Sequence, residues 1–400
     1  MNKKLSLAVA GAVLAFGASA ANAGIVIPAG DWTVDIGGNV NAYYQNSKYT
    51  GALGGVSNSN VISTGLLPSA LGIGAKTRQN DLDIAFQFTF FTGVDAGSNN
   101  NAGSGGTVGA GSQGALGGNT LNVRQAYLTF GDASWGTIKA GRDLGIYASD
   151  AILSDMTLLG VGGAAGGGGN STLGRIGSGY VYADWVGQIS YASPNWNGFS
   201  FAVGVREPWT NKTNGTSDDN RNNMGFEGKV SYEWAGDYAG KVWSSAITQK
   251  YETNGAGVAG TGYTARGIDV GAKVALADFG LVGYYYDGKG LSGGANLLNG
   301  LPFLGGTDAD VNGGYVQGTY KVPGVGTKLG LSWGESKTDG TTAGQSEYTD
   351  KSWIVGAYHP LTKSLNLVAE YSDHKVESLG NVAGADGKIK TISLGAILFF

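Results

Sequence analysis

The sequence predicts an all-β fold, an antiparallel transmembrane barrel of about 16 strands. Three observations support this prediction. About 16 segments alternate between two faces with a period of two residues, as β-strands do. Long polar connections alternate with short turns along the chain, which is typical of outer-membrane barrels. The chain also ends on a strictly alternating segment whose last residue, Phe400, is aromatic.

Residues 1–23 have the features of a cleaved export signal. Lys3 and Lys4 form a positive start, an apolar stretch follows from residue 5 to 17, and Ala21-Asn22-Ala23 is a small-residue cleavage site. A transmembrane anchor is less favoured, because the apolar stretch is short and its far flank carries no charge. We therefore expect a barrel of residues 24–400 with a formal charge of about −6, which argues against nucleic-acid binding.

The alternating segments are the expected strands, each placed to within two to four residues. They cover residues 33–45, 69–77, 81–91, 121–130, 136–141, 180–191, 199–205, 225–234, 242–251, 267–275, 281–286, 314–321, 328–336, 352–359, 365–374 and 389–400.

The connections divide into eight long loops and seven short turns. The long loops are 46–68, 92–120, 142–179, 206–224, 252–266, 287–313, 337–351 and 375–388. The short turns lie near Arg78, Asp132, Pro194, Gly236, Asp278, Pro323 and Pro360. This order puts both chain ends on the short-turn side, as in barrels with periplasmic termini. A soluble β-sandwich has no reason to segregate its loops in this way.

The residues on the two strand faces fit a barrel with an apolar outer surface and a polar, water-filled lumen. Ile268, Val270, Ala272 and Val274, for example, oppose Asp269, Gly271 and Lys273. Aromatic residues gather near both ends of the expected strands, which predicts two interfacial girdles. The chain has no cysteine, so the barrel is expected to hold together without disulfides. Its 73 glycines have no triplet period, which excludes collagen.

The last strand resembles the terminal signal by which outer-membrane barrels are recognised for assembly. Ile392, Leu394, Ala396 and Leu398 lie on one face before the final Phe400. Phe400 is therefore expected to be an assembly signal, read by the outer-membrane barrel assembly machinery.

The segment from Val123 to Met156, VRQAYLTFGDASWGTIKAGRDLGIYASDAILSDM, resembles the fourth and fifth strands and constriction loop of general trimeric Gram-negative porins. The matching features are an Arg-x-Ala-aromatic strand, a short turn, and Gly141-Arg142 opening a long loop. The resemblance implies a 16-stranded outer-membrane barrel, a homotrimer, and a third loop that folds inward and narrows the lumen.

Carried over by position, Asp150 and Asp155 are the acidic side of this constriction. The resemblance implies that Arg124 and Lys139 lie on the basic wall and Arg142 at the start of the loop. Opposed charges set up a transverse field that favours hydrated dipolar solutes. The basic residues of the constriction are at least as numerous as the acidic ones, so the sequence does not decide between cation and anion selectivity.

Two features of this region do not follow the pattern. Turning Arg124 inward also turns Leu128 and Phe130 inward and Gln125 and Thr129 outward, which requires a subunit contact, a bulge or a different register. The glycine run 166–169 predicts a mobile far half of the loop, which argues against a fixed place for Arg175 in the constriction.

Passive diffusion of small hydrophilic solutes and ions is the favoured function, with no cofactor, no metal and no catalysis. Expected partners are outer-membrane lipids and lipopolysaccharide. One alternative is an adhesive or structural barrel, whose carboxylates at 218, 219, 308 and 310 could bind Ca²⁺ or bridge lipopolysaccharide. Another is an outer-membrane hydrolase, for which His359 and His374 are the two available histidines.

Overall fold

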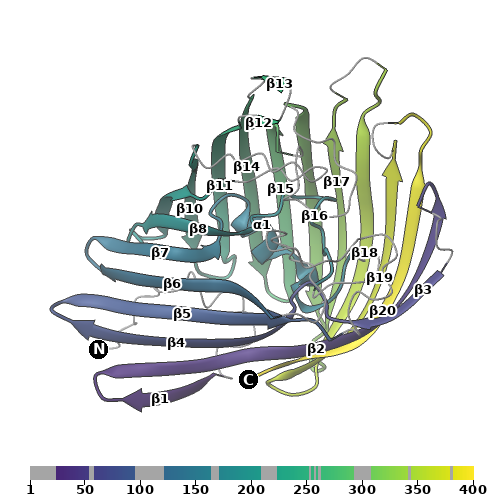
Figure 1. The fold of residues 1–400 in the computed structure, drawn as a ribbon. Helices are drawn as coiled ribbons and strands as arrows, with labels where there is room; N and C mark the ends of the chain where they lie inside the picture. Colours follow the sequence, from purple (N-terminus) through teal and green to yellow (C-terminus); the bar gives the residue numbers. More distant parts are fainter. Residues whose placement is uncertain are drawn as a thin grey trace.

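The computed structural model describes residues 24–53, 58–94, 121–163, 171–208, 223–251, 254–255, 258–259, 263–291, 308–340, 344–378 and 382–400. Within these ranges, 16 strands pair antiparallel in a closed ring that is completed where β2 pairs with β20 (Figure 1). The predicted all-β barrel is confirmed. The expected export signal, residues 1–23, lies outside the described residues.

Each ring strand corresponds to one predicted segment. The ring consists of β2 (Trp32–Gly51), β4 (Ser69–Gln79), β5 (Leu82–Thr92), β6 (Asn122–Asp132), β7 (Gly136–Leu144), β8 (Trp185–Ala192), β9 (Phe199–Arg206), β10 (Gly225–Trp234), β11 (Gly240–Tyr251), β14 (Tyr263–Leu276), β15 (Phe279–Lys289), β16 (Asp310–Lys321), β17 (Lys328–Thr338), β18 (Tyr348–Pro360), β19 (Leu365–Glu377) and β20 (Gly387–Phe399).

Four further short strands were not predicted. β1 (Ile25–Ala29) and β3 (Asn58–Ser63) both pair with β2, and β12 (Asn254–Gly255) pairs with β13 (Val258–Ala259). The predicted loop 46–68 therefore contains the end of β2 and all of β3. The predicted strand 180–191 begins only at Trp185, because the residues before it belong to a loop inside the barrel.

Turns of two to six residues join the ring strands at one end, as predicted. Two turns have only two residues, and in the one between β4 and β5 Asn80 and Asp81 have φ angles of 47° and 62°. Two successive positive φ angles match the right-handed twist of the flanking strands, and Asn and Asp tolerate this conformation better than other residues with a side chain. By analogy with other outer-membrane barrels, this is the periplasmic end.

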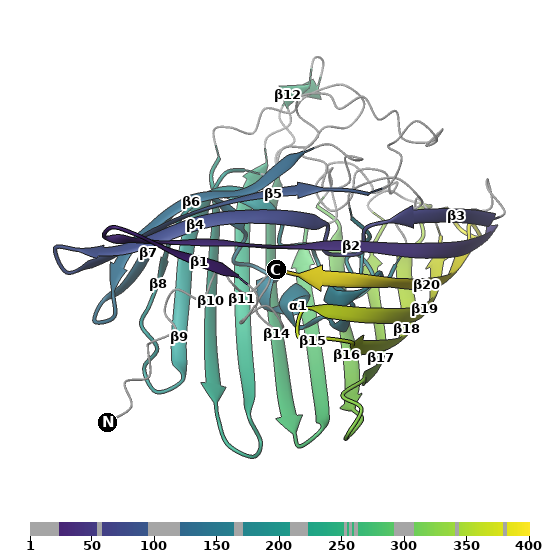
Figure 2. The same ribbon diagram turned by 90° about the horizontal axis from the view of Figure 1, so that it is seen from below.

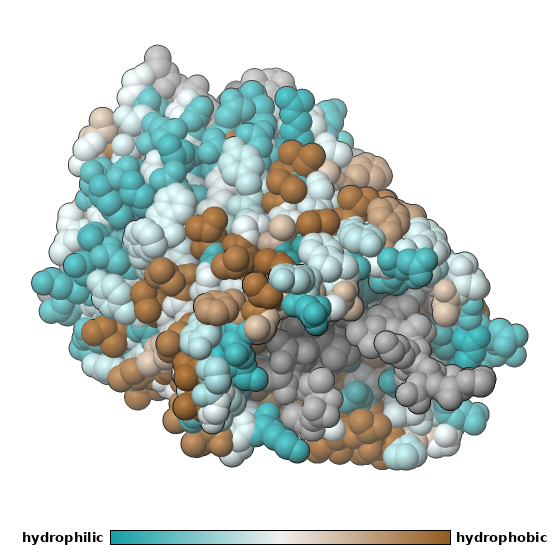
Figure 3. Space-filling model, turned by 180° about the vertical axis from the view of Figure 1, so that it is seen from behind, coloured by the Kyte–Doolittle hydropathy of each residue, from teal (hydrophilic) through white to brown (hydrophobic). Residues whose placement is uncertain are grey.

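The two faces of the sheet carry the predicted chemistry. On β14, Ile268 and Val270 are 57% and 56% exposed on the outer face, whereas the intervening Asp269 is 2% exposed. Hydrophobic side chains form a band across the outside of the barrel, bordered by hydrophilic residues (Figure 3). No helix among the described residues is long and apolar enough to cross a membrane.

The ring closes where the last residue meets the middle of β2 (Figure 2). The Gly38 N–H donates to the Phe400 carbonyl at 2.9 Å, and the Phe400 N–H donates to the Gly38 carbonyl at 3.1 Å. A Cβ atom at position 38 would lie 2.1 Å from the Ala70 carbonyl oxygen, so only glycine fits here. Beyond this point β1 replaces β20 as the neighbour of β2.

Deleting Phe400 is expected to reduce the yield of folded barrel several-fold, because two closing hydrogen bonds and the terminal aromatic ring are lost together. The fraction that does fold should keep the single-channel conductance of the wild type, since the hydrogen bonds of Phe400 go to Gly38 of the wall and not to the inner loop. Heat-modifiable gel migration measures the yield, and Phe400→Tyr is the control that keeps both bonds. A wild-type yield from the deletion variant would contradict an assembly role.

Candidate functional site: the inner loop and the lumen wall

The described parts of the connection between β7 and β8, residues 145–163 and 171–184, lie inside the barrel and are called the inner loop. They include the helix α1 (Ser149–Ser154) and the 3-10 helix η3 (Met156–Leu159). Figure 1 shows α1 within the ring of strands. Tyr147 and Tyr180 of the loop pack in a buried cluster with Trp243 and Tyr315 of the wall. The predicted inward-folded third loop is therefore part of the packed interior.

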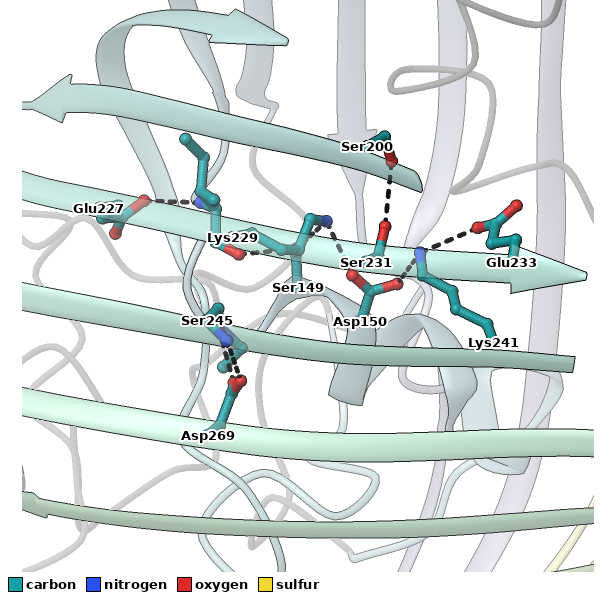
Figure 4. Close-up of polar contacts among 12 residues, drawn as sticks. Ser149, Asp150, Ser200, Glu227, Lys229, Ser231, Glu233, Lys241, Ser245 and Asp269 are labelled. Atoms are coloured by element: carbon teal, nitrogen blue, oxygen red, sulfur yellow. Dashed lines mark hydrogen bonds and ion pairs between the residues drawn. The ribbon is translucent and has the colours of Figure 1, made fainter. Parts of the chain in front are cut away.

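A buried ion pair fixes the start of the inner loop. Glu227 on β10 accepts a 2.6 Å hydrogen bond from the Ile146 N–H, and its other oxygen binds Arg206 on β9 at 2.5 Å. The side chains of Arg206 and Glu227 are 1% and 2% exposed. On β11, the Ser245 hydroxyl accepts a bond from the Ala148 N–H at 3.1 Å. The loop is thus tied to the wall before its first helix begins (Figure 4).

Asp150 on α1 faces two lysines of the wall (Figure 4). Its carboxylate lies 2.8 Å from the Lys229 ammonium and 2.6 Å from the Lys241 ammonium. Burial alone would raise the pKa of the Asp150 carboxyl, but the two lysine charges and their hydrogen bonds outweigh burial and lower the pKa to about 2. Asp150 therefore stays ionised and holds α1 against β10 and β11.

The middle of the inner loop is held by Glu370 on β19. One carboxylate oxygen of Glu370 accepts hydrogen bonds from the N–H groups of Val161 and Gly162, each at 2.8 Å. The other oxygen accepts a 2.6 Å bond from the Tyr358 hydroxyl. A Cβ atom on Gly160 would lie 2.1 Å from this second oxygen, so the close approach of loop and wall requires glycine there.

Arg175 anchors the far half of the inner loop, contrary to the predicted mobility. This side chain is completely buried, and its guanidinium binds the Ser332 hydroxyl at 2.5 Å and the Ser352 hydroxyl at 3.1 Å. Because β17 and β18 supply these partners, the segment from residue 171 to 183 is fixed to the wall opposite its origin. The glycine run 166–169 lies outside the described residues.

Asp155 forms its hydrogen bonds within the inner loop. Its carboxylate accepts hydrogen bonds from the N–H groups of Thr157 and Arg175, at 2.9 and 3.2 Å, and from the Tyr180 hydroxyl at 2.8 Å. All three donors belong to the inner loop. Of the two carboxylates expected to form the acidic side, only Asp150 forms ion pairs with lysines of the wall among the described residues, and Asp155 instead joins the two halves of the loop.

Arg124 turns inward through a β-bulge. On β5 and β6 the pairing shifts from Thr89 opposite Gln125 to Phe90 opposite Val123, which leaves Arg124 as the extra residue. Arg124 and Gln125 are therefore both buried, at 4% and 2% exposure, while Leu128 stays outward at 49%. The bulge resolves the conflict in the sequence pattern without turning polar side chains to the lipid. The Arg124 guanidinium lies 4.9 Å from the centre of the Phe91 ring.

The other two basic residues expected at the constriction lie in different surroundings. Lys139 forms an ion pair with Asp143 and lies 4.9 Å from the centre of the Tyr127 ring. Arg142 pairs in register with Ala126 and Gly187, and its charge interacts with that of Arg124 and with Tyr182 of the inner loop. The basic groups that meet Asp150 are thus Lys229 and Lys241 rather than Arg124, Lys139 or Arg142.

Lys241 was missed as a lumen residue because the predicted strand began one residue after it. The predicted strand started at Val242, whereas β11 starts at Gly240, so Lys241 is an inward position in line with Trp243 and Ser245. Its register partner on β14 is Lys273, which also faces inward. The third lysine, Lys229, was predicted to be lumenal, and its contact with Asp150 agrees with that prediction.

The two histidines have different hydrogen-bond partners. His374 is buried and pairs with Asp350, and His359 binds the Thr327 hydroxyl near the periplasmic end. Among the hydrogen bonds of the described residues, no serine hydroxyl reaches either histidine ring. Of the carboxylates considered for Ca²⁺, Asp308 and Asp310 lie near Lys289, and residues 218 and 219 lie outside the described ranges.

Comparison with known proteins identifies a family and a shared fold. A family model described as Gram-negative porin matches residues 8–378. The chain is similar to the anion-selective porin of Comamonas acidovorans, with 16% identity and a TM-score of 0.62, covering 92% of this chain and 100% of that one. A Salmonella typhi OmpF complex gives 17% identity and a TM-score of 0.60, covering 94% and 100%.

A third similar structure is OmpT of Vibrio cholerae in a trimer form. It shares 16% identity with a TM-score of 0.57, covering 92% of this chain and 99% of that one. At these identities the solved structures show a common fold only. No curated protein sequence matches the chain.

Asp150→Asn is expected to lower the free energy of unfolding by about 2–3 kcal/mol at pH 7, because a carboxyl with a pKa of about 2 when folded has a pKa of about 4 when unfolded. A lowered pKa stabilises the fold fully above about pH 4 and ceases to do so as the pH falls to about 2. The difference between variant and wild type should therefore disappear near pH 2. Urea unfolding in lipid vesicles, followed by tryptophan fluorescence, measures it.

The matched control for this measurement is Asp237→Asn, in the exposed turn between β10 and β11. It should change stability little at any pH. If the Asp150 variant unfolds with wild-type stability at pH 7, the ion pairs with Lys229 and Lys241 do not hold the loop.

Proposed function

The chain belongs to the Gram-negative porin family, and from this premise we propose how solutes and ions pass through its lumen. The protein is an outer-membrane channel for the diffusion of solutes. The hydrogen bonds and ion pairs that anchor the inner loop reach β2, β10, β11 and β16 to β19. Small hydrophilic solutes and ions then pass through the part of the lumen that the loop leaves open.

The charges on this path favour anions. The carboxylates of Asp150 and Asp155 are buried and bonded, and Asp143 is paired with Lys139. Lys76 and Lys273, in contrast, are exposed at inward positions of the wall, where the exposed carboxylates of Asp35 and Glu233 offset only part of their charge. Because exposed charges act on a passing ion more than neutralised ones do, we infer a mild anion preference. The sequence alone left the choice between cation and anion selectivity open, and this inference favours anions.

Planar-bilayer recording in asymmetric KCl tests both parts of this proposal. We expect open channels whose reversal potential lies towards that of chloride, and Lys273→Gln should lower the chloride-to-potassium permeability ratio by roughly twofold. The control Lys363→Gln changes an exposed lysine in the turn between β18 and β19 and should leave the ratio unchanged. A purified protein that does not conduct would refute the channel path, and a cation preference would refute the charge assignment.

We propose further that the barrel is a homotrimer. Support comes from the trimer form of the similar Vibrio cholerae OmpT and from the apolar outer face of β5 and β6. On that face Phe86, Phe88 and Leu128 are 36%, 45% and 49% exposed. The contact would use the strand that carries Arg124, as the resemblance to trimeric porins implies.

Seminative gel electrophoresis tests the trimer. The unheated protein should migrate at about three times the mass of the boiled chain. Phe88→Lys should give a monomer, because a charge in the contact is neither paired nor hydrated. Val316→Lys places the same charge on the outer face of β16 and should keep the trimer. Monomeric migration of the unheated wild type, or trimers from both variants, would overturn the assignment.

A further inference from the structure

The surface that the inner loop turns towards the open lumen is apolar. Because this loop lies inside the ring of strands, any side chain that it leaves unburied borders the lumen. Within its described parts, the residues that are not buried are Leu153, Ser154, Leu158, Leu159, Gly177 and Asp184. Three of these are leucines of α1 and η3, and we call Leu153, Leu158 and Leu159 the leucine face. The acidic side chains of Asp150 and Asp155, in contrast, are buried.

The leucine face is backed by the packed interior and fixed to the wall. Two of its leucines pack against the buried cluster that contains Tyr147 and Trp243. On β16 the Gln317 side-chain amide donates to the Ser154 carbonyl at 3.0 Å, and its oxygen accepts a 2.8 Å bond from the Met156 N–H. These two bonds hold the link between α1 and η3, so the leucines keep one position in the lumen.

Lys273 lies beside the leucine face. On the inner side of the sheet, Gln317 on β16 pairs in register with Val282 on β15, and Val282 pairs with Lys273 on β14. Val282 is half-buried and packs against the same cluster as the leucines, so it extends the apolar surface towards the lysine. Neighbouring strands are about 4.8 Å apart, so the Cα atoms of Lys273 and Gln317 are about 10 Å apart. A flexible lysine side chain at this distance places its ammonium at the edge of the apolar surface.

Lys273 carries positive charge that its neighbours leave uncompensated. The charged groups that interact with it are Lys229, Lys241, Asp150 and Glu233. Asp150 is bonded to both of the other lysines, and Glu233 lies 3.1 Å from the Lys241 ammonium. Among the ion pairs of the described residues, none includes Lys273. Three ammonium groups therefore share two carboxylates, and the exposed Lys273 presents the net positive charge to the lumen.

The combination of an apolar face with a net positive charge selects among solutes. Leucine side chains offer no hydrogen-bond partner for sugar hydroxyls, and a dianion would place its second charge against them, where it loses hydration. A small inorganic anion gains nothing from the leucines. A monoanion with an apolar group gains from both parts, because its apolar surface leaves water while its charge stays beside the ammonium.

We propose that the leucine face and Lys273 form a subsite for monocarboxylates that carry an aromatic or branched aliphatic group. The carboxylate lies beside the Lys273 ammonium, and the apolar group covers Leu153 and Leu158. This subsite rests on the proposed channel function and defines the class of anion that the channel favours. Binding of this kind is weak, which suits a channel, because a solute that is to pass must also leave the subsite.

Titration of the chloride current in planar bilayers tests the subsite on the purified barrel. The probes are benzoate, which carries both groups, acetate, which lacks the ring, and benzamide, which lacks the charge. Benzoate should half-block the current at a concentration about tenfold lower than acetate does, because only its ring covers the leucines. It should act at a concentration about threefold lower than benzamide, since an exposed charge pair contributes modestly to binding.

Variants of both parts of the subsite separate the apolar contact from the charge. Leu153→Ser with Leu158→Ser should raise the half-blocking concentration of benzoate about tenfold, while acetate should block as it does in the wild type. Leu153→Met with Leu158→Met keeps an apolar face and should keep the benzoate block, which tests the proposal even if the serine variant fails to fold. Lys273→Gln should raise the half-blocking concentration of benzoate about threefold.

The matched control is Lys76→Gln, on β4 across the ring from β14, which should lower the preference for chloride and leave the benzoate block unchanged. Equal half-blocking concentrations of benzoate and acetate, a wild-type benzoate block in the serine variant, or equal effects of Lys76→Gln and Lys273→Gln on that block would each overturn the subsite. Saturation-transfer NMR measures benzoate binding without current. A barrel that discriminates between the probes by NMR but does not conduct would refute the channel and not the subsite.

Discussion

Backbone hydrogen bonding is the constraint on which this structure depends. In hydrocarbon an unpaired N–H or C=O group costs several kcal/mol, so a sheet that crosses a membrane must have no open edge. The ring meets this requirement through 16 strand pairings, the last of which joins β20 to β2. Everything inside the ring is then free to be polar, which is why charged side chains can be buried against the inner loop while the outer face stays apolar.

Buried charges determine where the inner loop lies. Arg206 with Glu227, Asp150 with two lysines, and the Glu370 and Arg175 networks each pair a buried charge with groups of the fold. Such pairs add little net stability, but loss of one partner destabilises the fold because the other charge is left unpaired in the interior. The cost falls on any conformation in which the loop leaves the wall, so these charges favour one loop position over others. The inner loop therefore keeps one position in the lumen, and this position sets the width of the pore.

Alternation of side chains was enough to predict the barrel, but the site depended on details that alternation does not contain. Sixteen strands followed from the period-two alternation and from the regular change between long loops and short turns. Asp150 was found, yet its partner Lys241 was not, because a boundary error of two residues removed it from its strand. The bulge at Arg124 was one of three options open from the sequence. Arg175 was misjudged because a glycine run says nothing about the tertiary hydrogen bonds of a residue several positions away.

The pairing of β2 with β20 also determines when the folding chain stops exposing unpaired strand edges. Residues 39–51 pair with residues 387–399, so this contact joins almost the two extremes of the chain. Closing a segment of this length costs roughly 5 kcal/mol of chain entropy, and high contact order of this kind slows folding. Until the final strand is in place, β2 and β19 are both bare edges able to capture strands of other molecules. The pairing of β20 with β2 thus ends the stage of folding in which the sheet is prone to aggregate.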